Sequence, residues 1–205
     1  EHVRRALQDA AQRLRAWWED QERERLLAYA ALALILVAAL AARAWYSYLG
    51  LPYMHMWDEP QITHTALQML KSGETNPHFF SYGSLLIYAN RGVDALHYLY
   101  KLAQPAEADP LRGMDEIEIG PLGPWPAVGD YRWYISPPSF LLWNRWLAVL
   151  LGVGSVAAAF VLARQIGGLW AGVIAAAFLA GQPFYALDLN SLALTDGPAA
   201  ALLMG

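Results

Sequence analysis

The sequence predicts an all-α membrane protein whose transmembrane helices are separated by a long loop outside the membrane. Of its 205 residues, 57% are hydrophobic and 16% are charged, against about 25% charged residues in an ordinary soluble domain. The hydrophobic residues gather in uncharged runs long enough to cross a bilayer. Nine Trp and eleven Tyr residues supply the amphipathic rings that collect at membrane interfaces.

The composition also excludes several classes of protein. The formal net charge of −4 provides no basic field for a nucleic acid, so no nucleic-acid partner is expected. The absence of Cys excludes disulfides, thiolate metal sites and a cysteine nucleophile. No pattern of a removable signal peptide is visible at the start of the sequence.

Four apolar segments are expected to be transmembrane spans. They cover about residues 26–46, 144–163, 166–187 and 198–205, and the last is expected to run on into a longer chain. Arg25 precedes the first segment, and Gly167-Gly168 marks a tight turn between the second and third. Small residues such as Gly152 and Ser155 let transmembrane helices approach closely, so the second and third spans are expected to pack as a hairpin.

Residues 1–25 are expected to form a cytoplasmic amphipathic helix on the membrane surface. Apolar residues recur there at spacings of three and four, and arginines occupy the other face. A solvated helix that binds a partner is the alternative. Together with Arg164 in the turn at 164–167, these arginines predict a cytoplasmic N-terminus, which puts the loop 47–143 and residues 188–197 outside an integral plasma or inner membrane protein.

The loop 47–143 is too long for a simple connection, and its periodicity predicts two helices. Asp58 and Pro60 are typical of a helix start and Gly73 of a helix end. The second helix, 85–102, is expected to lie in the membrane interface. Its apolar face would contain Leu86, Val93, Leu96 and Tyr100, with Arg91, Asp94 and Lys101 opposite. Residues 104–139 are rich in Pro and Gly, which predicts an irregular loop or lid.

Asp58 and Glu59 are the most prominent candidates for chemistry. Adjacent carboxylates at a helix start could supply an ionised base or a metal ligand. They could equally cap the helix, and the local sequence alone favours that structural interpretation. His55 and His64 could join Asp58 in a metal site, although packing at the membrane interface is the favoured interpretation of both.

The order of motifs along the chain resembles that of a known enzyme family. A span is followed by Asp58-Glu59, by Leu-Lys-Ser-Gly at 70–73, by Asn-Pro at 76–77 and by Tyr-Gly-Ser-Leu-Leu-Ile-Tyr at 82–88. This order resembles the first outer loop of polyprenyl-phosphate-sugar-dependent membrane glycosyltransferases with the GT-C fold, the protein O-mannosyltransferase-like and aminoarabinose-transferase-like enzymes. The segment 191–198 is similar to that family's acidic loop before the fourth span. The resemblance covers about residues 26–205 and implies a GT-C-like domain.

The resemblance implies transfer of a sugar from a polyprenyl-phosphate donor with inversion at the anomeric carbon. Asp58 matches the catalytic base, Glu59 its neighbour, and Asp196 a carboxylate that binds the acceptor or a divalent cation such as Mg or Mn. We therefore expect Asp58 and Asp196 to approach one shared water or cation. Independently, the guanidinium groups of Arg91 and Arg132 are suited to a lipid phosphate.

Two further functions compete with the enzyme. The chain could be a non-catalytic accessory or structural subunit of a larger membrane complex, derived from the same scaffold. Further spans after residue 205 would favour the enzyme. A membrane channel ranks third, because residues 146–163 and 166–187 hold no charged residue to mark a path.

Overall fold

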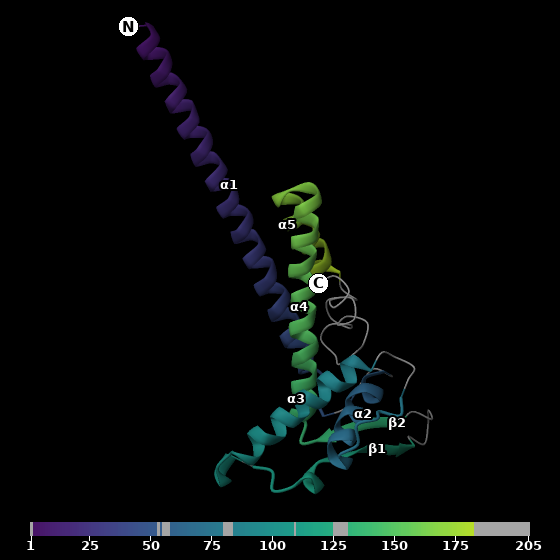
Figure 1. Ribbon diagram of the computed structural model, residues 1–205. Coiled ribbons are helices and arrows are strands. Elements are labelled where there is room, and N and C mark those ends of the chain that lie inside the picture. Colours follow the sequence, from purple (N-terminus) through teal and green to yellow (C-terminus); the bar gives the residue numbers. More distant parts are fainter. Residues whose placement is uncertain are drawn as a thin grey trace.

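The computed structural model describes residues 2–52, 54, 58–79, 84–108, 110–124 and 131–182, and within them the chain is mostly helical. Its helices and strands are α1 (His2–Ser47), α2 (Asp58–Ser72), α3 (Leu85–Leu102), β1 (Glu118–Pro124), β2 (Tyr131–Ser136), α4 (Ser139–Gly167) and α5 (Leu169–Gly181), with short 3-10 turns at Ala106–Ala108 and Met114–Glu116 (Figure 1). We call residues 58–136, which contain α2, α3 and both strands, the cap region. The cap region lies where α1 ends and α4 begins (Figure 1).

Within the described ranges, two helices are long and apolar enough to cross a membrane. They are Asp20–Ser47, which is the second part of α1, and Ser139–Gly167, which is all of α4. They contain the first and second predicted spans. Of the third predicted span, 166–187, the described part is α5, an apolar helix of 13 residues, and the fourth, 198–205, lies outside the described residues.

α1 is one uninterrupted helix of 46 residues. Residues 2–47 contain neither Gly nor Pro, so nothing in the sequence ends the helix at the expected boundary near residue 25. The segment 1–25 is therefore not separated from the first span by a break. Its first half extends beyond the end of the α4 and α5 pair (Figure 1).

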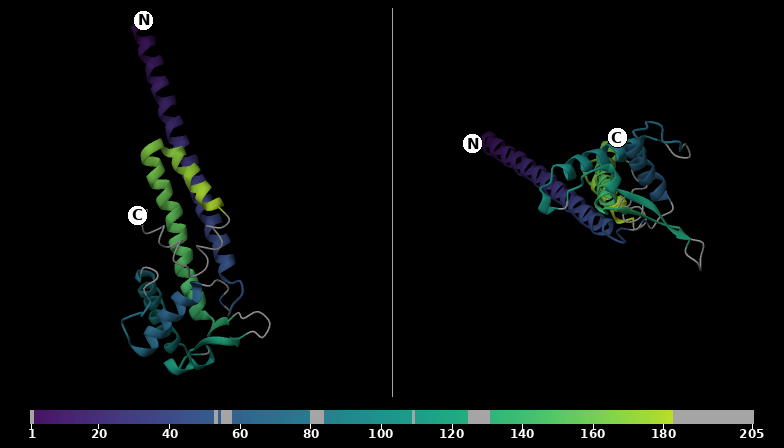
Figure 2. Two further views of the ribbon diagram at one scale, coloured as in Figure 1. Left: turned by 90° about the vertical axis from the view of Figure 1, so that its right-hand side faces the viewer. Right: turned by 90° about the horizontal axis from the view of Figure 1, so that it is seen from below.

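α4 and α5 form the expected hairpin. Gly168 joins them with a φ of +82°, a conformation that glycine adopts without strain. Gly172 lies so close to Phe160 that a Cβ atom there would come within 2.7 Å of the Phe160 carbonyl oxygen. α1 lies along this hairpin (Figure 2). The shared core contains Ala28, Val156, Phe160, Val173 and Ala176.

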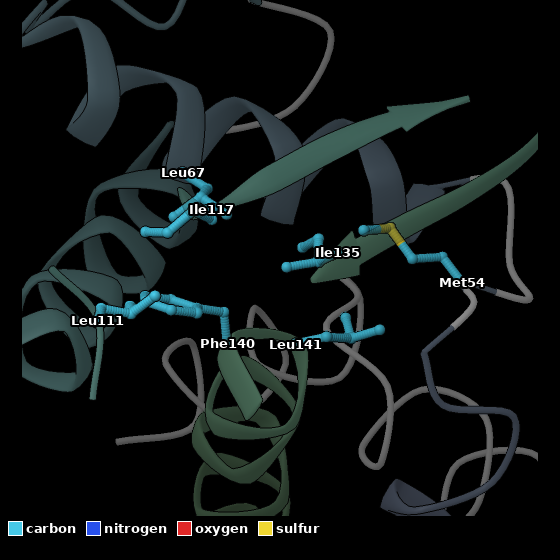
Figure 3. Close-up of a cluster of buried hydrophobic side chains, with 7 residues drawn as sticks. All are labelled: Met54, Leu67, Leu111, Ile117, Ile135, Phe140 and Leu141. Carbon is cyan, nitrogen blue, oxygen red and sulfur yellow. The ribbon is translucent and has the colours of Figure 1, made fainter. Parts of the chain in front are cut away.

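The cap region has two apolar clusters. The first joins α2 to α3 through Ile62, Ala66, Met69, Leu86 and Ile87. The second joins α2, the strands and the start of α4, as Figure 3 shows, and contains Met54, Leu67, Leu111, Ile117, Ile135, Phe140 and Leu141. Both predicted loop helices are confirmed, and Gly73 ends α2 with a φ of +74° as a C-terminal glycine should.

Residues 118–124 and 131–136 form strands, contrary to the expectation of an irregular segment over residues 104–139, so the fold is mostly rather than purely helical. β1 and β2 pair antiparallel, with Glu118 opposite Ser136 and Ile119 opposite Ile135. Proline is tolerated in β1 because both strands of a two-stranded ribbon are edge strands. The fully buried Ile135 fixes the ribbon to the second cluster.

In α3 the polar residue Asp94 is turned toward the protein interior, whereas the expected position of the helix in the membrane interface stays a prediction. Asp94 and the neighbouring polar residues Asn90 and His97 are buried, whereas Leu96 and Tyr100 have 64% and 53% of their surface exposed. Asp94 and His97 each have one polar partner on α4, described below, and Asn90 donates to the Leu86 carbonyl oxygen within α3. Of the expected apolar face of α3, Leu86 is packed against α2, and Leu96 and Tyr100 are left uncovered by the described part of the chain.

Candidate functional site

A buried ion pair joins α1, α2 and α4. Arg145, in the second turn of α4, donates from Nε to Glu59 Oε1 at 2.7 Å and from Nη2 to Glu59 Oε2 at 2.9 Å. Both side chains are fully buried. Two parallel, charge-assisted hydrogen bonds of this kind are among the strongest polar contacts in proteins.

Arg145 also holds the end of α1. Its Nη1 donates to the carbonyl oxygens of Ser47 at 3.0 Å and Leu49 at 2.8 Å. The last carbonyl groups of a helix have no partner within that helix, so the guanidinium satisfies the carbonyl oxygen of the buried Ser47, the last residue of α1. One side chain thus connects the end of α1, the first turn of α2 and the start of α4.

Glu59 is bound on its backbone side as well. Thr63 Oγ1 donates to the Glu59 carbonyl oxygen at 2.7 Å and lies 3.4 Å from the Met54 sulfur. Both Thr63 and Met54 are buried. The hydrogen bond from Thr63 lies within α2, so the contact of Glu59 with another helix is the ion pair with Arg145, an anchoring role that the sequence did not predict.

Asp58 is the first residue of α2. Because it directly precedes Glu59, its backbone is held at the same junction, at the end of both long apolar helices. Its side chain and that of His55 lie outside the described residues, as does Asp196. The expected approach of Asp58 to Asp196, and the divalent cation they would share, therefore stay predictions.

The other candidates lie in the cap region. Arg91 is half-buried on α3, and Arg132 belongs to β2, although its side chain is not described. His64 is half-buried on α2, and burial lowers its pKa. Among the described side chains, no group of three or more His, Cys, Asp or Glu residues is arranged to hold a metal ion.

A second polar cluster lies between α3 and α4. Asn144 Nδ2 donates to Asp94 Oδ1 at 3.0 Å, and both side chains are fully buried. Burial raises the pKa of Asp94 well above its ordinary value, and the hydrogen bond from Asn144 offsets this only in part. A neutral carboxyl is therefore the favoured form, because an isolated buried charge is costly.

His97 lies one turn further along α3. Its Nε2 is 2.9 Å from Ser139 Oγ, and its ring is edge-on to Phe140 and tilted against Trp143, with centroids 4.6 and 4.7 Å away. Burial lowers its pKa to about 4, and the charge of Lys101 acts in the same direction. His97 is thus neutral at physiological pH and serves as a polar and aromatic contact between α3 and α4.

The sequence contains a signal for the buried ion pair of Arg145. A charged residue near the start of an apolar span is costly unless it has a partner, and Glu59 is the nearest acid to follow the first span after Asp58. The cluster around Asp94 had a weaker signal, the spacing of Asn90, Asp94 and His97 by four and three residues, which puts them on one helix face.

Comparison with known proteins adds no family to this geometry: no protein family, curated protein or solved structure matches the chain.

Proposed function

We propose that this protein is a membrane glycosyltransferase that moves a sugar from a polyprenyl-phosphate donor to an acceptor at the membrane surface next to the cap region. The observation that carries the proposal is the anchoring of Glu59 by Arg145. It fixes the backbone of Asp58 at the end of two helices that could cross a membrane. A donor lipid could reach a base at this position from within the membrane, and an acceptor could reach it from the aqueous side.

In the proposed reaction, the acceptor hydroxyl or amine attacks the anomeric carbon from the face opposite the phosphate. Asp58 takes the proton of the nucleophile as the new bond to carbon forms. The bond between the anomeric carbon and the phosphate oxygen breaks, and its electron pair leaves with the polyprenyl phosphate. General-base assistance of this kind contributes about 10²- to 10⁴-fold to a rate.

Glu59 acts in this proposal as a positioning residue. Both of its carboxylate oxygens accept hydrogen bonds from Arg145, so its side chain is engaged in holding the junction rather than directed at a substrate. The pair instead fixes the neighbouring Asp58, because a displacement of about 1 Å at a reacting group can cost about 10²-fold in rate.

The leaving phosphate requires a positive partner. A divalent cation, Mg or Mn, held by Asp58 and Asp196 would offset its charge. Arg91 and Arg132 are the proposed guanidinium partners of the phosphate oxygens. The proposed orientation has the N-terminus in the cytoplasm and the cap region outside, so that acceptor and donor meet on the outer face.

The direct test is loss of label from the donor, because it needs no knowledge of the acceptor. Membranes containing the protein are supplied with polyprenyl-phosphate mannose or aminoarabinose labelled in the sugar, and the label remaining on the lipid is followed in time. The proposal expects faster loss than in membranes without the protein, and expects a chelator to slow it if a cation takes part. No protein-dependent loss with either donor would contradict the proposal for these sugars.

The alternative is an accessory or structural subunit of a larger membrane complex. The ion pair between Glu59 and Arg145 is also compatible with this alternative, because a buried ion pair can serve the structure alone. An accessory subunit should copurify with a larger membrane protein and lose no function when Asp58 becomes Asn. The enzyme should remain active after purification to a single chain.

A further inference from the structure

A polar pocket lies at the end of the α4 and α5 hairpin that is remote from the cap region. It has a volume of about 520 Å³ and is lined by α1 on one side and by the turn between α4 and α5 on the other. Its charged lining residues are Arg25 and Glu24 from α1 and Arg164 from α4. The proposed reaction uses none of them.

The two arginines are available to a ligand. Arg25 and Arg164 are exposed, and neither forms an ion pair with any of the side chains that the structure describes. The guanidinium of Arg164 lies 5.8 Å from the centre of the Tyr29 ring, a cation–π contact that limits where it can point. Together with Glu24, the two arginines give the pocket a formal net charge of +1.

The surroundings identify the ligand as an amphiphile. Leu26, directly after Arg25 on α1, has 72% of its surface exposed, and Leu162, two residues before Arg164 on α4, has 42%; each lies on the side of its arginine toward the apolar body of the helices. Trp170, in the pocket wall, is 46% exposed. Charged residues thus give way to exposed apolar ones at the same level on both sides of the pocket, as they do at a membrane interface, where Trp and Tyr are also enriched.

We propose that this pocket binds the phosphate group of an anionic phospholipid, whose acyl chains lie against the exposed apolar residues of α1 and α5. Basic pockets between transmembrane helices bind the head groups of lipids such as cardiolipin. The first turn of α5, which has no side-chain cap at Gly168, adds backbone amides that favour an anion at this side of the pocket. A soluble anion would make no contact with the exposed apolar residues beside the pocket.

Native mass spectrometry of the whole protein in detergent tests the proposal. Phosphatidylglycerol is titrated against phosphatidylcholine with the same acyl chains, and inorganic phosphate is added as a competitor. We expect the anionic lipid to bind at least about 10-fold more tightly, given about 1 kcal/mol for each basic residue near an anionic head group. Equal affinity for the two lipids would overturn the proposal, and so would competition by phosphate at the same concentration as the lipid, which would indicate a soluble-anion site.

Variants locate the binding. Arg25→Gln and Arg164→Gln are each expected to weaken binding of phosphatidylglycerol about five-fold, without changing that of phosphatidylcholine. Arg23→Gln is the matched control, because Arg23 is exposed on the same helix but does not line the pocket. An equal effect of all three variants would mean that general surface charge, rather than the pocket, attracts the lipid.

Discussion

Glu59 and Arg145 are separated by 86 positions in the chain and form a fully buried, two-pronged ion pair, with nitrogen–oxygen distances of 2.7 and 2.9 Å. Arg145 uses its remaining nitrogen on the carbonyl groups at the end of α1. The pair therefore determines how the cap region is attached to the two long apolar helices. Because Asp58 directly precedes Glu59, variants at these neighbouring residues test both the stability of the fold and the proposed activity.

Removal of one partner of this pair should destabilise the protein severely. Glu59→Gln leaves a buried guanidinium charge without its counter-ion, at a cost of about 3–5 kcal/mol. We expect a marked fall in the thermal midpoint. The double variant Glu59→Gln with Arg145→Met removes the stranded charge and should recover part of the loss. A loss in the double variant equal to the sum of the losses in Glu59→Gln and Arg145→Met alone would show that the two side chains do not depend on each other.

Stability should depend on pH through Asp94 and His97, in opposite directions. The lowered pKa of His97, about 4 in the fold against 6.5, means that its contribution is complete above pH 6.5 and is lost as the pH falls toward 4. The raised pKa of Asp94 means that its contribution is present at low pH and is lost as the pH rises through that pKa. The two effects partly cancel in the native protein.

Asp94→Asn removes only the contribution of the acid. The variant should lose stability more steeply than the native protein on acidification from pH 6.5 to 4, and should be relatively more stable at alkaline pH. Thermal midpoints across the pH range measure this. Superimposable profiles for the two proteins would contradict the assignment of a raised pKa to Asp94.

The hairpin of α4 and α5 should be sensitive at Gly172 and tolerant at Gly154. A methyl group at Gly172 would meet the Phe160 carbonyl oxygen at 2.7 Å, whereas one at Gly154 meets nothing within 4 Å. We expect Gly172→Ala to cost about 1–3 kcal/mol through overpacking, and Gly154→Ala to be neutral or slightly stabilising. A thermal midpoint equal in both variants would show that the close approach is not required.

The exposed apolar face of α3 should meet lipid. Because the chain has no Cys, a single spin label can be introduced at Leu96, which is 64% exposed, or at the control position Glu107, in an exposed turn of the cap region. In vesicles, oxygen should relax the label at 96 more strongly than a water-soluble nickel complex does, with the reverse order at 107. Stronger relaxation by the nickel complex at both positions would mean that α3 lies in water.

The same Cys-free background tests the orientation. A single Cys at Gln165, beside the turn between α4 and α5, should be protected from an impermeant maleimide in intact cells, and one at Glu107 should be labelled. Both positions are exposed in the structure, so burial would not explain protection. Labelling at 165 and protection at 107 would reverse the proposed topology.

Local signals in the sequence predicted where the helices lie, but they did not predict which helices pack against one another. Asp58, Pro60 and Gly73 delimit α2 because caps and turn residues act over one helical turn. The partner of Arg145 and the inward orientation of Asp94 could not be predicted, since each depends on which helix packs alongside. The paired strands were missed because Pro and Gly in β1 conceal the alternation that normally identifies a strand.

The most direct test of the proposed activity compares Asp58→Asn with Asp115→Asn in donor-label assays. Asp115 is an exposed acid in a 3-10 turn of the cap region, so the two variants make the same chemical change in and away from the proposed site. The account predicts that Asp58→Asn slows loss of label from the polyprenyl-phosphate sugar by at least about 10²-fold, at unchanged protein level and thermal midpoint, and that Asp115→Asn turns over like the native protein. Native turnover by Asp58→Asn would contradict the account.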